Sequence, residues 1–158
     1  MGKQILKFIS GAAASIAIAF SVGVPAAAAY GNAWMGVANG GTVIYNTNQW
    51  YTSSTINPWS QNLPGTINDI SIQATVTSFP SFASGIQGRL CAERGVNDDC
   101  RSINDVIYGT TINGTTDIFE GASPSTSFYF QWRIQDSFSR PIPSTTVIAR
   151  QTINVFYE

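Results

Sequence analysis

Histidine is absent from the 158-residue sequence, and lysine occurs only at Lys3 and Lys7. Without an imidazole, the chain lacks the general base of Ser-His-Asp and Cys-His catalytic sites and the common nitrogen ligand of metallohydrolases. After residue 29, six arginines against nine acidic residues give a net charge of −3. No basic stripe is therefore available to neutralise phosphates, and no nucleic-acid partner is expected.

The first 29 residues have the features of a secretory signal peptide. A short segment with two positive charges precedes the uncharged apolar stretch 8–24, and Pro25 and four alanines follow it. We predict cleavage before Tyr30, which leaves residues 30–158 as one domain with no stable membrane insertion. An uncleaved anchor is the alternative, but 17 apolar residues are short for a membrane span of about 20. Export places the mature domain in an oxidising compartment.

The sequence has two cysteines, Cys91 and Cys100, with eight residues between them. In an oxidising compartment two cysteines normally pair, so we predict a disulfide that ties a hairpin at its open end. The alternatives fit less well, because a redox motif is C-x-x-C and a zinc site needs four ligands. Glu93, Asp98 and Asp99 offer oxygen ligands for calcium, but their spacing favours a solvated hairpin tip. No metal or cofactor is predicted.

The dominant period after residue 29 is two, which is typical of strands with one buried and one exposed face. The longest alternating runs are 70–77, 128–135 and 153–157, and shorter β-type runs occupy 43–45, 86–91, 106–108 and 145–149. Turn-forming clusters separate them at 39–41, 62–65, 113–114, 121–124 and 141–143. No helix longer than a turn is predicted. We therefore predict an all-β fold, a single antiparallel β-sandwich of about seven or eight strands with one hairpin disulfide.

Acidic residues offer little catalytic chemistry. A pair of carboxylates could act as acid and base. The acids, however, lie singly in loops or at strand ends, except for Asp98 and Asp99 in the loop between the cysteines. Adjacent loop acids are usually solvated charge, so the chain is predicted not to be an enzyme.

Aromatic residues are the stronger candidates for binding. Trp34 and Trp132 fall within strand-like runs and are expected in the core. Trp50, Tyr51 and Trp59 lie in the polar stretch 46–62, where they are expected to form a lid over one end of the sandwich. The alternative is a hot spot for a protein or a sugar, because Trp and Tyr dominate such sites.

Several short motifs follow one another along the chain in an order that supports a family resemblance. They are Gly31-Asn-Ala-Trp34, Ser84-Gly-Ile-Gln-Gly-Arg-Leu-Cys91, Gly109-Thr-Thr111, Phe130-Gln-Trp132, Arg140-Pro-Ile-Pro143, Arg150-Gln151 and Asn154-Val-Phe-Tyr157. In this order, within a short exported domain that carries a second cysteine after a loop, they resemble the FlhE-type periplasmic flagellar proteins. The resemblance covers nearly the whole of residues 30–158.

The resemblance implies a non-catalytic periplasmic accessory of flagellar assembly and swarming motility. Its expected partner is the flagellar rod or another flagellar structural or export protein, which it would bind to prevent misplaced assembly or leakage. No catalytic residue is carried over. Two surfaces are candidates for this contact: the last strand, with Val155 and Tyr157, which could pair with a partner strand, and the aromatic residues Trp50, Tyr51 and Trp59. The alternative function is a carbohydrate-binding or adhesive β-sandwich that uses these exposed aromatics.

Overall fold

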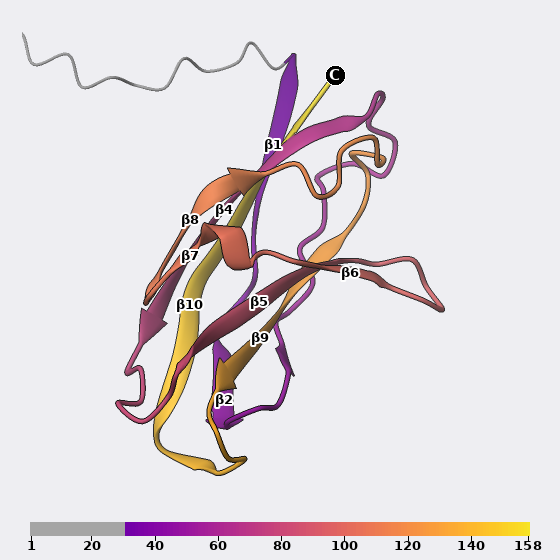
Figure 1. Cartoon of the computed structure of the whole chain (residues 1–158). Helices are drawn as coiled ribbons and strands as arrows, with labels where there is room; N and C mark the ends of the chain where they lie inside the picture. The colour runs from indigo at the N-terminus through magenta and orange to yellow at the C-terminus, as the bar shows by residue number, and fades with distance from the viewer. Residues whose placement is uncertain (1–30) are drawn as a thin grey trace, which may run out of the picture.

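A computed structural model describes residues 31–158, which form two antiparallel sheets (Figure 1). The predicted signal peptide, residues 1–29, lies outside the described residues. Within 31–158 there is no α-helix, only a single 3-10 turn, η1 (Asn104–Val106), and nothing helical is long and apolar enough to cross a membrane. The predicted fold class, an antiparallel β-sandwich with one hairpin disulfide, is confirmed.

The larger sheet has the order β1-β10-β4-β8-β7, and β2 also pairs with β10. Its strands are β1 (Asn32–Val37), β2 (Thr42–Asn46), β4 (Ile67–Thr77), β7 (Ile107–Tyr108), β8 (Thr111–Thr116) and β10 (Pro141–Tyr157). The smaller sheet has the order β3-β9-β5-β6. Its strands are β3 (Tyr51–Thr52), β5 (Gly85–Ala92), β6 (Asp99–Ser102) and β9 (Phe128–Gln135).

The core lies between the two sheets and follows the alternation of the sequence. In β9, Phe128, Phe130, Trp132 and Ile134 are buried, and the residues between them are only partly covered. Phe130 stacks on Trp132 with ring centroids 5.3 Å apart. The prediction that Trp34 and Trp132 belong to the core is confirmed, since their exposed fractions are 3% and 0%.

Two predicted breaks in the sheet are wrong. Residues 141–143 open the 17-residue strand β10, which joins the two runs predicted at 145–149 and 153–157. A one-residue bulge divides it, because Ala149 pairs with Thr75 but Thr152 already pairs with Gln73. Asn113 and Gly114 lie inside β8 and not in a turn. Glycine suits this strand position because a Cβ atom at Gly114 would lie 2.7 Å from Cγ1 of Val106.

Candidate functional site

The last strand does not offer an edge. Strand β10 pairs with β1 on one side and with β4 on the other. Val155 faces Trp34 and Ile70 in this register and is 0% exposed, and Tyr157 is 4% exposed. The expectation that this strand pairs with a partner is therefore wrong, because both rows of its backbone groups already pair within the sheet.

The three aromatic residues of the stretch 46–62 do not form one patch. Trp50 precedes β3, which pairs with β9 at Trp132. Trp59 follows the bridge between Ile56 and Phe128, at the opposite end of β9, and its side chain is 74% exposed. Tyr51 packs against the core, and its hydroxyl accepts a hydrogen bond from the Asn46 backbone N–H at 2.9 Å. Tyr51 thus supports the fold, whereas the two tryptophans are separate surface features.

Trp50 belongs to a polar pocket on the outer face of the smaller sheet. The pocket has a volume of about 160 Å³ and is lined by Trp50, Gln87, Gly88, Arg89, Ser102, Asn104 and Arg133. We call the side chains of Trp50, Gln87, Arg89, Ser102, Asn104 and Arg133 the arginine cluster. It collects residues from β5, β6 and β9, from η1 and from the segment before β3.

Strand register brings the arginine cluster together. Arg89 pairs with Ser102 on one side and with Gln131 on the other, so it points away from the buried Leu90. Arg133 pairs with Gln87, whose Oε1 accepts a hydrogen bond from the Arg133 Nε–H at 3.0 Å. Cross-strand neighbours share a face, so both arginines lie on the outer face of the sheet.

Gly88 forms the floor of the pocket. Its backbone N–H donates to Oδ1 of Asn104 at 3.0 Å, which fixes the Asn104 side chain at the rim. A Cβ atom at Gly88 would lie 2.5 Å from the buried Trp132 ring. Glycine at this position therefore lets the Trp132 ring pack directly beneath the pocket floor.

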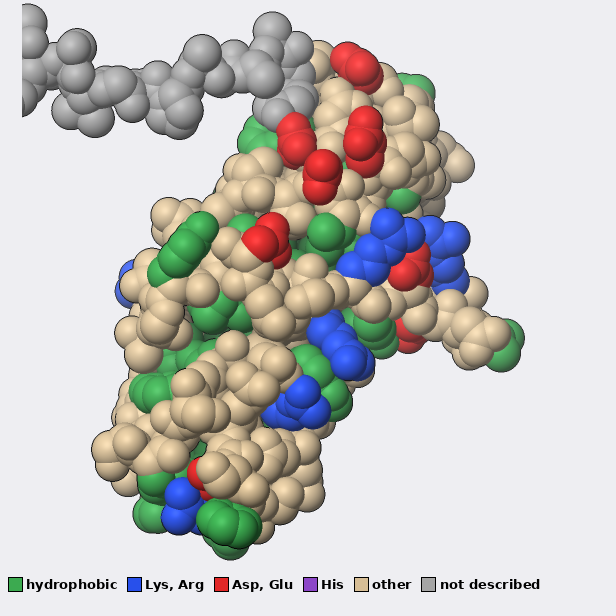
Figure 2. Space-filling model, in the orientation of Figure 1, with side chains coloured by type: hydrophobic (Ala, Val, Ile, Leu, Met, Phe, Trp, Pro, Cys, Tyr) green, Lys and Arg blue, Asp and Glu red, His purple; other side chains and the backbone are tan. Residues whose placement is uncertain are grey.

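The two arginines of the cluster lack acidic partners. Among the described residues, Arg94 and Arg101 pair with Asp99, and Arg140 pairs with Asp136. Arg89 and Arg133 instead lie over the Trp50 ring, with guanidinium carbons 4.2 Å and 4.6 Å from its centroid. Figure 2 shows arginine side chains gathered along one face of the molecule, some beside acidic groups and some beside hydrophobic ones. Uncompensated guanidiniums next to an indole make this pocket suited to binding an anion.

The disulfide between Cys91 and Cys100 joins directly paired residues of β5 and β6. It lies one residue pair from the loop, since Ala92 and Asp99 form the last pair. The prediction of a tie at the open end of the hairpin is therefore wrong, although the hairpin and its disulfide are confirmed. A disulfide fits an extracytoplasmic compartment.

The loop acids pair locally, with Asp98 accepting hydrogen bonds from the Arg94 backbone N–H and the Tyr129 hydroxyl.

Tyr129 covers the disulfide on the outer face of the sheet, with its hydroxyl 3.8 Å from Sγ of Cys100. Burial first, and then the hydrogen bond to Asp98, raise the pKa of Tyr129 to about 12. The backbone N–H of Arg94 and the Tyr129 hydroxyl lower the pKa of Asp98. Between an ordinary phenol pKa of 10 and this raised value, the folded chain keeps a proton that the unfolded chain loses. Stability from this group is therefore full below pH 10 and is lost as the pH rises toward 12.

We expect the replacement of Asp98 by asparagine to lower the pKa of Tyr129 while leaving it above 10, because burial remains. The measurement is the ultraviolet absorbance of tyrosinate against pH. Subtracting the curve of Tyr129→Phe isolates this residue, and circular dichroism checks that the chain is folded at each pH. An unchanged Tyr129 titration in Asp98→Asn would show that burial alone sets the pKa.

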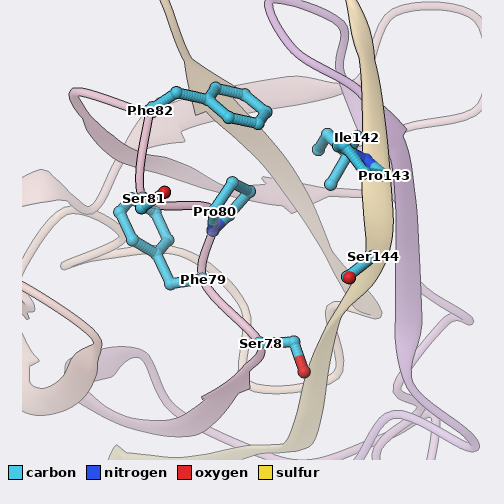
Figure 3. Close-up of a pocket in the computed structure, with 8 residues that line it drawn as sticks. All are labelled: Ser78, Phe79, Pro80, Ser81, Phe82, Ile142, Pro143 and Ser144. Carbon is cyan, nitrogen blue, oxygen red and sulfur yellow. The ribbon is translucent and has the colours of Figure 1, made fainter.

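A second pocket lies between the loop after β4 and the start of β10, with a volume of about 470 Å³ (Figure 3). Its lining residues are Ser78, Phe79, Pro80, Ser81, Phe82, Ile142, Pro143 and Ser144. In Figure 3, Phe82 extends from the loop toward Ile142. The lining carries no titratable side chain, so this pocket offers apolar contact and hydroxyl groups but no charge. No pattern in the sequence predicts this pocket, although the run Phe-Pro-Ser-Phe at 79–82 marks the loop.

Comparison with known proteins supports the fold. No protein-family model matches the sequence, and no curated protein matches it. Among solved structures, the crystal structure of FlhE is similar, with a TM-score of 0.61 and 16% sequence identity. The similarity covers 80% of this chain and 96% of FlhE. At this identity it shows the fold, and it confirms the predicted resemblance: the chain has an FlhE-type fold.

Proposed function

We propose that this chain is a non-catalytic periplasmic accessory of flagellar assembly that binds a flagellar rod, structural or export protein and so prevents misplaced assembly or leakage. The similarity to FlhE, which extends over 96% of that protein, is the observation that carries the proposal. The disulfide supports an oxidising location, because such bonds persist outside the cytoplasm.

The chemistry of the described surface is consistent with a binding role. The chain has no histidine, and no group of three acidic or sulfur ligands gathers among residues 31–158. The arginine cluster has hydrogen-bond donors for a ligand but no acid–base pair.

Deletion of the gene in its own host tests the proposal. We expect swarming to be reduced, and electron microscopy to show missing or misplaced filaments. The complete coding sequence should restore both, whereas a version without residues 2–29 should not, because its product would stay in the cytoplasm. Normal swarming and normal flagella in the deletion strain would contradict the proposal.

A carbohydrate-binding or adhesive module is the second candidate. The observation in its favour is Trp59, a residue that is 74% exposed and so offers its ring for stacking on a sugar. Trp50 fits this function less well, because two guanidiniums already lie over its ring. Normal flagella in the deletion strain would make glycan binding the leading hypothesis.

A further inference from the structure

We propose that the arginine cluster binds a carboxylate on an acidic segment of the protein partner. The assignment of a protein partner rests on the proposed function, whereas the carboxylate chemistry rests on the pocket alone. The first argument is charge. Arg89 and Arg133 lie over one indole at 4.2 Å and 4.6 Å, so their guanidinium carbons are within about 9 Å of each other. No described acid forms an ion pair with either, in a domain of net charge −3.

The second argument is the balance of hydrogen-bond donors and acceptors. A guanidinium has five N–H donors and no acceptor. No described acceptor takes a hydrogen bond from the Arg89 guanidinium, whereas Arg133 is bound only to Gln87. The Oδ1 atom of Asn104 is occupied by the Gly88 N–H, so its amide nitrogen is the end left for a ligand. A pocket rich in free donors is complementary to a group that only accepts, and a carboxylate is planar and matches the guanidinium fork.

The third argument is pre-organisation. The Trp50 ring contacts both guanidiniums, and the hydrogen bond to Gln87 fixes the orientation of Arg133. Long side chains that are already ordered lose less entropy when a ligand binds. An isolated surface arginine would not have this advantage.

A protein carboxylate fits better than a phosphate or an acidic sugar. The cluster lacks the lysine and the α-helix N-terminus that commonly complete a phosphate site. Its indole is engaged by the arginines, which leaves less of the ring to stack on a sugar. The neighbouring outward side chains Gln131 and Gln135 add uncharged amides that can hydrogen-bond a peptide backbone.

The test uses the mature domain and a dye-labelled Glu-Ser repeat peptide, with a Gln-Ser repeat as its uncharged match. We expect the Glu peptide alone to bind, more weakly as salt rises, and to shift the NMR signals of the Trp50 indole N–H and the Gly88 amide. Arg89→Gln and Arg133→Gln should each raise the Kd about tenfold or more. Arg94→Gln, which removes the same charge from an exposed arginine outside the cluster, should leave the Kd unchanged.

Several results would overturn the proposal. They are equal binding of the Gln peptide, an unchanged Kd in both cluster variants, and tighter binding of inorganic phosphate or polygalacturonate than of the Glu peptide. Circular dichroism melts of each variant show whether a loss of binding reflects unfolding, and Arg89→Lys, which keeps the charge, should retain part of the affinity. Peptide binding with normal swarming in the deletion strain would support the carboxylate site and contradict the flagellar role. Lost swarming without peptide binding would support the flagellar role and contradict the carboxylate site.

Discussion

Replacement of Gln151 by leucine is expected to lower the free energy of unfolding by about 3 kcal/mol, although the two side chains are similar in size. Gln151 is 0% exposed. Its Oε1 accepts a hydrogen bond from Nε1 of Trp132 at 2.6 Å, and its Nε2 donates to Thr42 Oγ1 and to the Ile148 carbonyl, both at 2.9 Å. Leucine would leave the Trp132 N–H without its partner in the core, and each such group costs about 1–3 kcal/mol.

The bond from Trp132 to Gln151 also joins the two sheets, because Trp132 lies in β9 and Gln151 in β10. It is a buried polar contact between the sheets, and we expect it to help set how the two sheets pack on each other. The bulge at Arg150, whose φ is 50°, turns Gln151 inward. Gln151 is in phase with the buried Ile153 and Val155, whereas the bulge shifts it out of phase with the buried Thr146 and Ile148.

Urea unfolding measures the effect, and Gln73→Leu is the matched control because Gln73 is exposed on the neighbouring strand β4. The control should change stability by less than about 0.5 kcal/mol. Trp132→Phe should cost less in the Gln151→Leu background than in the natural chain, since the bond is already lost. Equal stabilities of the Gln151→Leu and Gln73→Leu variants would contradict this account of the core.

The parts of the fold that could be predicted are those in which neighbouring residues alone decide the structure. Alternation at 70–77 and 128–135 identified strands β4 and β9, because one face of each packs on the core. The disulfide followed from two cysteines in a chain that was predicted to be exported. Trp34 and Trp132 are buried as their strand-like surroundings indicated.

The parts that could not be predicted depend on pairing between distant segments. Residues 141–143 contain two prolines and indicated a break, yet they begin β10, where a register shift against β2 accommodates them. The last strand was expected to offer a free edge. Its position in the sequence does not determine which strands pair with it, and this pairing is what makes the expectation wrong. The arginine cluster also depends on pairing between distant segments. Trp50, Arg89 and Arg133 are far apart in sequence and meet only through the register of β3, β9 and β5.

The second large effect concerns the disulfide. Replacement of both Cys91 and Cys100 by alanine is expected to lower the free energy of unfolding by about 2–3 kcal/mol, which for a domain of this size is a fall of about 10 °C in Tm. The bond closes a short loop, since the cysteines are nine positions apart, and it thereby restricts the unfolded chain. It also holds β6, a four-residue strand at the edge of the smaller sheet, whose one partner among the strands of residues 31–158 is β5.

Loss of the disulfide should also disturb the candidate site. Strand β6 ends at Ser102 and leads into Asn104, and both residues belong to the arginine cluster. Thermal melts of the natural chain and of the double variant, each with and without a thiol reductant, measure the effect. Reductant should lower the Tm of the natural chain to that of the double variant and leave the variant unchanged. If a thiol assay shows full reduction and the Tm of the natural chain still does not move, the packing of Tyr129 and the ladder between β5 and β6 hold the edge strand without the covalent bond.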